Sequence, residues 1–156
     1  MKLVLVLLLM LSPTSLLAQS AFEKLVGTWR GEGQYSEAPA HVQLRCRITI
    51  EGDGARIELK GRCGSSLGAE DFFMEFVLAP DREVRLVRSA SERAAGSKIE
   101  TLSGPLGRNG MVVRGTAPGE EVVVQLLLNP DGTLEFATRE TNGPKEAVSQ
   151  VTLSRQ

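Results

Sequence analysis

The stretch Gly27-Thr28-Trp29-Arg30-Gly31-Glu32-Gly33 decides how the rest of the chain is interpreted. Successive side chains of a β-strand point to opposite faces, so Trp29 and Tyr35 share one face with the glycines and the other face is polar. Glycine is unfavourable inside a strand unless the strand bends or another group approaches closely. The pattern predicts an opening strand that coils and directs Trp29 inward. Gly31 and Gly33 either clear space for a ligand or permit the bend.

After this stretch the chain consists of short strands and tight turns. Alternating or β-rich runs, bounded by Gly, Pro, Asn or Asp, predict strands at about 26–36, 41–51, 55–63, 71–79, 83–89, 98–104, 111–116, 121–128, 133–140 and 147–154. The stretch 89–97 is ambiguous and reads best as a rim loop. Short connections favour a meander, and closure removes its edge strands. We therefore predict an all-β fold: a single antiparallel up-and-down β-barrel of about ten strands after a short N-terminal helical turn.

The stretch from Leu25 to Gly33 resembles the opening strand of calycin-type barrels and is most similar to the Gly-Thr-Trp-x-Gly-x-Gly start of nitrobindin-like domains. The mature chain also resembles small exported bacterial proteins with a lipocalin-like fold, whose later strands would correspond to Arg45-Cys46-Arg47 and Gly61-Arg62-Cys63 here. The resemblance implies a calycin barrel. Nitrobindin-like domains bind haem through a histidine near the C-terminus, and this chain has no histidine after His41. We therefore expect no haem and no other cofactor.

Residues 1–20 have the features of a signal peptide. Lys2 gives a positive start, 3–11 is an unbroken apolar run, and Ala18-Gln19-Ser20 supplies small residues for cleavage. The apolar run is too short to span a membrane. We expect one domain at 21–156, periplasmic or secreted after cleavage near Ala18 or Ser20, with no stable membrane span in the mature protein.

The two cysteines, Cys46 and Cys63, favour a disulfide in an exported chain. Both lie on apolar strand faces on either side of the hairpin signal Gly52-Asp53-Gly54. If the second and third of these residues form a two-residue turn, Cys46 faces Gly61 and Cys63 is its diagonal neighbour. A register shifted by two residues would place the cysteines directly opposite each other. In either register a bond needs only modest adjustment.

The sequence offers little for catalysis or metal binding. His41 is the only histidine and lies on the polar face of a strand, and no serine lies in a nucleophile-elbow context. The adjacent pairs Glu70-Asp71 and Glu120-Glu121 point to opposite faces, so we interpret them as turn or rim charges. The 18 Lys and Arg are scattered among 19 Asp and Glu, which does not favour a nucleic-acid partner. We expect a monomer without enzyme activity or bound metal.

The predicted function is binding of a small apolar or amphipathic molecule inside the barrel. Few aromatic side chains are available to fill the interior, so we expect an apolar cavity between the Trp29 strand and the Phe72 strand. The expected ligand-binding residues are Trp29, Gly31, Gly33, Tyr35, Phe72, Met74, Phe76 and Arg88. The alternative is a barrel with a filled core that acts as a non-enzymatic envelope interaction module or inhibitor-like protein.

Alternation also places a few polar side chains on apolar faces. Arg88 shares the face of Val84, and Thr138 and Glu140 share the face of Phe136. An inward Arg88 would orient an anionic head group of a ligand. Otherwise each of these side chains lies near a strand end and reaches solvent at the rim.

Overall fold

The structure is a computed structural model that describes residues 21–91, 102–117 and 119–156. The signal peptide expected at 1–20 and most of the ambiguous stretch at 89–97 lie outside the described residues. The first described residues, 21–25, form one helical turn, as predicted.

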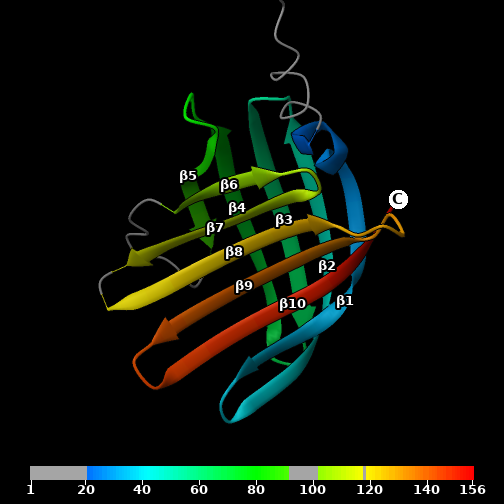
Figure 1. The fold of residues 1–156 in the computed structure, drawn as a ribbon. Coiled ribbons are helices and arrows are strands. Elements are labelled where there is room, and N and C mark those ends of the chain that lie inside the picture. The colour runs from blue at the N-terminus through cyan, green and yellow to red at the C-terminus, as the bar shows by residue number, and fades with distance from the viewer. Residues whose placement is uncertain (1–20, 92–101, 118) are drawn as a thin grey trace, which may run out of the picture.

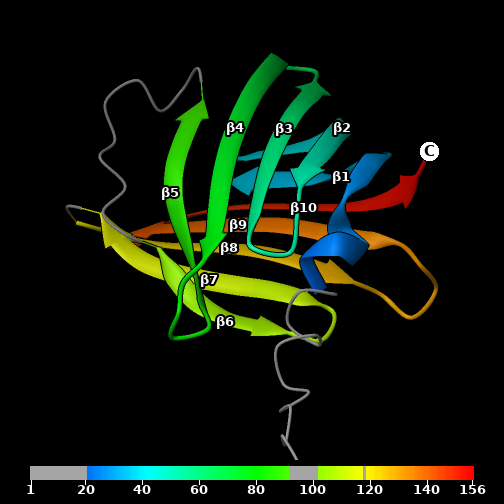
Figure 2. The same cartoon turned by 90° about the horizontal axis from the view of Figure 1, so that it is seen from above.

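Ten antiparallel strands form a closed barrel in which each strand pairs with its neighbours in sequence and β1 pairs with β10 (Figures 1 and 2). The strands are β1 (Gly27–Glu37), β2 (Ala40–Gly52), β3 (Arg56–Ser65), β4 (Gly68–Leu78), β5 (Glu83–Ser91), β6 (Ser103–Gly107), β7 (Gly110–Ala117), β8 (Glu120–Leu128), β9 (Leu134–Asn142) and β10 (Lys145–Arg155). This confirms the predicted all-β, up-and-down barrel. Pairing of β1 with β10 closes the ring, so neither of these two strands has a free edge. Between β5 and β6 the ladder is short: among the described residues it joins only Glu83–Arg85 to Ser103–Pro105.

The helical turn covers one end of the barrel, here called the capped end. Phe22 and Leu25 are both fully buried in the core. Trp29 is also fully buried, and its Nε1 donates a hydrogen bond to the carbonyl oxygen of Leu25 at 2.8 Å. The predicted inward position of Trp29 is therefore confirmed, and the side chain lies in the core together with the N-terminal apolar residues Phe22 and Leu25.

Arg155 joins the last strand to the start of the barrel. Its two terminal nitrogens donate to the carbonyl oxygens of Val26 at 2.5 Å and Lys24 at 2.6 Å. Its guanidinium also lies over the ring of Trp29, 4.3 Å from the centroid, which is cation–π geometry. One side chain thus satisfies two carbonyls at the end of the helical turn and covers the indole.

Gly31 and Gly33 are needed because the backbone of β10 approaches β1 closely. A Cβ atom at Gly31 would lie 1.9 Å from the carbonyl oxygen of Thr152, and one at Gly33 would lie 2.0 Å from that of Gln150. Only glycine fits against backbone at such distances. Of the two explanations considered for these glycines, the structure supports strand coiling.

Most strand boundaries lie within two residues of the prediction, and two strands differ by more. The sixth strand was expected at 98–104, of which 98–101 lie outside the described residues. Its observed part, β6, is Ser103–Gly107, because Gly107 pairs with Gly110 and continues the ladder up to a two-residue turn. The stretch 64–68 was expected to be a loop, but Ser65 pairs with Gly68, so β4 begins three residues early. In both cases a tight turn replaced the longer loop that the glycines suggested.

Cys46 and Cys63 form a disulfide, as predicted. They are directly opposite each other in the β2–β3 ladder, with Cα atoms 4.1 Å apart. This is the register shifted by two residues, and its cause is the turn. Asp53 Oδ1 accepts hydrogen bonds from the backbone N–H groups of Ala55 at 2.8 Å and Arg56 at 3.0 Å, which lengthens the connection.

Replacing both cysteines with alanine is expected to destabilise the barrel without unfolding it. Closing a loop of this size is worth roughly 3 kcal/mol in the chain-entropy model. The β2–β3 ladder already restrains the loop, so we expect a loss of only about 1–2 kcal/mol in the free energy of unfolding. Urea unfolding of the oxidised protein and of the double variant measures the difference. Two titratable thiols in the native oxidised protein would contradict the bond.

Candidate functional site

The interior of the barrel is sealed at the capped end and accessible at the other, here called the open end. Inward side chains toward the capped end are almost completely buried: Trp29, Ile48, Ile50, Ile57, Leu59, Phe76, Leu134 and Leu153. Inward positions toward the open end are only half-buried: Gly33, Tyr35, Leu44, Phe72, Thr138 and Ser149. Solvent therefore reaches the inner wall from the open end only as far as the middle of the barrel.

Two phenylalanines meet in the middle of the interior. Phe72 on β4 stacks on Phe136 on β9, with ring centroids 5.4 Å apart and ring planes at 9°. These strands are five positions apart in either direction around the ring of ten, so the pair spans the interior. Gly61 makes room for it, because a Cβ there would lie 2.1 Å from the Phe72 ring. The pair separates the sealed core from the open end.

The structure divides the predicted ligand-binding residues among four environments. Trp29 and Phe76 lie in the sealed core, and Gly31 and Gly33 lie against the backbone of β10. Tyr35, Phe72 and Met74 are half-buried on the inner wall. Arg88 lies on the outer face. Tyr35 and Phe72 are thus brought to the accessible part of the interior, whereas Met74 lies beside the buried Leu59, on the capped side of Phe72.

The prediction that Arg88 shares the inner face of Val84 is wrong. The β4–β5 register shifts between Glu75, which pairs with Arg88, and Phe76, which pairs with Leu86. The extra residue is Val87, and this bulge reverses the alternation after it. Arg88 therefore points outward, where its Nε donates to Glu75. It cannot orient a head group inside the barrel.

Carboxylates surround the inner side of the open end. Glu140 lies there at the inward position that alternation predicted, close to Glu37, Glu70 and Glu120. Partial burial by the surrounding wall, and then repulsion from these three charges, raises the pKa of Glu140. By register, Lys145 is the one basic side chain among the described residues that lies at an inward position beside them. Among the described residues, the inner side of the open end therefore carries more negative than positive charge.

Hydrogen bonds hold several of these polar groups in place. The hydroxyl of Tyr35 donates to Glu37, and Asn142 Nδ2 donates to Glu120 at 3.0 Å. Further inside, the hydroxyls of Thr138 and Ser149 are 2.8 Å apart. The wall thus changes from apolar at the Phe72 level to hydroxyl groups and then to carboxylates at the rim.

Glu140→Gln is expected to raise the melting temperature at pH 7 and to change it little at pH 4. A carboxyl whose pKa is higher in the folded than in the unfolded protein binds its proton more tightly when folded. Its contribution to stability therefore falls as the pH rises from the usual value of 4.5 through the folded-state pKa. Thermal unfolding at both pH values tests this. Glu121→Gln, on the outward face of β8, is the control and should show no such pH dependence.

The described residues contain no group of three His, Cys, Asp or Glu side chains that could hold a metal ion. Within the same residues, the helical turn at 21–25 is far too short to cross a bilayer.

A solved structure shares this fold, and a second was matched more weakly. The S-type phycobiliprotein lyase CPES from Guillardia theta matches with a TM-score of 0.65 over 86% of this chain and 90% of the lyase, at 14% sequence identity. A redesigned β-barrel, mFAP1, solved bound to DFHBI, matches over 86% of this chain and 98% of its own, with a TM-score of 0.44 and 12% identity. No protein-family model and no curated protein matches the chain. Fold and topology together define a calycin-like β-barrel.

Sequence reasoning missed two features of the site and one of the capped end. Phe136 was assigned to an inner face, but its contact with Phe72 joins strands that are distant along the chain. Glu37 lies at an inward position of the same strand as Trp29, so alternation could have identified it. Alternation could have identified Arg155 as an inward residue too, because it lies two residues after the inward Leu153.

Proposed function

We propose that this protein is an exported, non-catalytic barrel that binds a small apolar or amphipathic molecule at its open end. The observation that carries the proposal is the difference between the two ends of the interior. The capped end is sealed, while Tyr35 and Phe72 on the inner wall remain half-buried. An apolar molecule resting on the Phe72–Phe136 pair would bury both itself and this wall.

The rim restricts the polar part of such a ligand. Glu37, Glu120 and Glu140 disfavour an anionic head group, so the preferred ligand has a neutral or positively charged end. Thr138 and Ser149 supply hydroxyl groups between the rim and the apolar floor. The ligand class is therefore an apolar body with a protonated amine or an uncharged polar group at one end.

Export is part of the proposal, and the disulfide supports it. Disulfides persist in oxidising compartments and are rare in the cytosol. Cys46 and Cys63 are joined, which is the state expected of cysteines in an exported protein.

The second candidate is a barrel that acts through its outer surface. The Phe72–Phe136 stack favours it, because these rings fill the middle of the interior. The two candidates differ in whether the open end binds small molecules.

Native mass spectrometry of the protein purified from its own exported fraction tests both parts of the proposal. We expect a mature chain that begins near Gln19 or Ala21 and carries a small molecule, which is lost on denaturation. Titration with long-chain amines and with fatty acids of equal length should show tighter binding of the amines. Tyr35→Ala and Glu140→Lys should weaken amine binding, whereas Glu121→Gln should not.

A chain that begins at Met1 would overturn export. If the protein is exported but binds none of the probes, the ligand-binding role is overturned and the second candidate is favoured. Tighter binding of fatty acids than of amines would overturn the proposal that the carboxylates at the rim disfavour an anionic head group.

A further inference from the structure

A groove of about 620 Å³ lies on the outer face of β1–β4, on the opposite side of the wall from the barrel interior. Most of its lining residues point outward from these strands. Five of them are basic and one is acidic: Arg30, Arg45, Arg47, Lys60, Arg62 and Asp71. Three of the basic side chains have carboxylate partners: Arg45 pairs with Glu32 at 3.1 Å, Lys60 with Glu51 and Glu58, and Arg62 with Asp71. Among the described residues, the positive charge left without such a partner is that of Arg30 and Arg47.

Three of these arginines form a row across adjacent strands. Arg30 on β1 is directly opposite Arg47 on β2, which is directly opposite Arg62 on β3. Like charges at opposed positions destabilise a sheet. Arg62 is neutralised by Asp71, with Nη1 2.6 Å from Oδ2. Within the described part of the chain, no carboxylate lies within ion-pair distance of Arg30 or Arg47.

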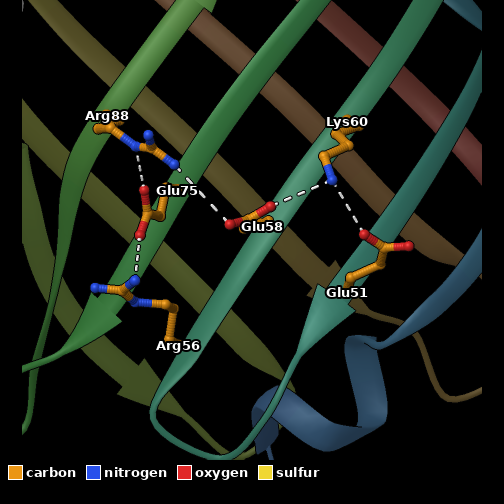
Figure 3. A network of polar contacts seen from close by, with 6 residues as sticks. All are labelled: Glu51, Arg56, Glu58, Lys60, Glu75 and Arg88. Carbon is orange, nitrogen blue, oxygen red and sulfur yellow. Dashed lines mark hydrogen bonds and ion pairs between the residues drawn. The ribbon is translucent and has the colours of Figure 1, made fainter.

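A parallel row of acidic residues on the same face shows the contrast. Glu51, Glu58 and Glu75 are likewise directly opposed across β2, β3 and β4. Here the protein supplies the counter-charges itself. Lys60 bridges the first two carboxylates at 3.1 and 3.2 Å, and Arg88 contacts the second and third (Figure 3). The basic row has no such bridge at its Arg30 and Arg47 positions.

We propose that the groove binds a compact, soluble molecule carrying phosphate groups, with Arg30 and Arg47 as its principal contacts. Planar guanidinium groups bind phosphate oxygens through paired hydrogen bonds, and two adjacent arginines suit an anion with more than one charge. The volume lies in the range of small-molecule sites.

The surroundings favour a soluble molecule over a membrane surface. The exposed large hydrophobic residues of the described chain are Leu67 and Val87, and neither lines the groove. A face without exposed apolar side chains has nothing to insert between lipids. Charge and shape together therefore indicate a small polyanion.

Inorganic tripolyphosphate is the probe for the test. Isothermal titration at about 50 mM salt should detect binding that weakens as the salt concentration rises. Arg30→Gln and Arg47→Gln should each weaken it roughly tenfold, since each removes a charge-assisted hydrogen-bonding group. Arg47→Lys should fall in between, because it keeps the charge but loses the paired geometry. Arg114→Gln is the matched control: an exposed arginine on β7, outside the groove.

Two further measurements complete the test. Without tripolyphosphate, Arg47→Gln should be at least as stable as the wild type, because it relieves the opposed charges. Its melting temperature should no longer rise when tripolyphosphate is added.

Equal loss of binding in Arg114→Gln would overturn the site in favour of general charge attraction. Binding to phosphatidylglycerol vesicles but not to tripolyphosphate, or no binding at all, would overturn the proposal.

Discussion

Replacing Trp29 with alanine is expected to lower the free energy of unfolding by roughly 3–5 kcal/mol, the usual cost of truncating a large core side chain. Trp29 is fully buried, donates a hydrogen bond to Leu25 and lies under the guanidinium of Arg155. Its loss therefore removes packing from the core and also frees the helical turn at 21–25. Because Trp29 is the only tryptophan, unfolding of the variant in urea should be followed by circular dichroism.

Trp29→Phe is the matched control. Phenylalanine keeps an aromatic ring in the core but cannot donate to the carbonyl oxygen of Leu25. We expect a smaller loss, about 1–2 kcal/mol, for the missing hydrogen bond and the smaller ring. If native Trp29 had the emission of a water-exposed indole, or if Trp29→Ala were as stable as Trp29→Phe, the indole would not be what holds the capped end.

The architecture could be predicted because it depends on local rules. Alternation placed Trp29, Cys46 and Cys63 on inner faces, and short turns between the runs left a meander as the simplest topology. Closure of the barrel and the disulfide are consequences of these two patterns. The strand registers were harder to predict. The β2–β3 register, for example, depends on the hydrogen bonds that Asp53 accepts in the turn between these strands.

The site could be predicted only in part because it depends on contacts between distant strands. The stack of Phe72 on Phe136 depends on how the strands are staggered in the closed barrel. Alternation within a single strand shows which face a residue is on, but not which residue it meets across the interior. The bulge at Val87 had no sequence signal, since valine is a favoured strand residue. One extra residue reversed the face of Arg88 and moved it from the expected ligand site to the outer ion-pair network.

The ion pairs of Glu75 with Arg56 and Arg88 give the second large expected effect on stability. Glu75 lies on the outer face, yet only 2% of its surface is exposed, because Arg56 and Arg88 cover it. Arg56 Nη1 is 3.0 Å from Glu75 Oε1, and Arg88 donates to the other carboxylate oxygen (Figure 3). Arg88 also lies over the ring of Phe73, 5.2 Å from its centroid. The bulge at Val87 is what brings Arg88 to this position.

Changing Arg56 and Arg88 together to methionine is expected to cost about 2–3 kcal/mol. Methionine keeps the covering stems but leaves the Glu75 carboxylate buried without a cation, which is strongly destabilising. The expected loss is below that for a fully buried pair, because both arginine side chains are more than half exposed and the pairs are screened by water. Urea unfolding at low and high salt measures the loss, and the difference between wild type and variant should shrink as salt is added.

Adding Glu75→Leu to the double methionine variant separates charge from packing. If the buried charge causes the loss, replacing it with an apolar side chain should restore most of the stability. If the arginines act only by covering β4, leucine should restore none of it. Glu75→Leu in the wild-type background is the remaining corner of the cycle. There it should be destabilising, since it leaves Arg56 and Arg88 side by side without their shared carboxylate.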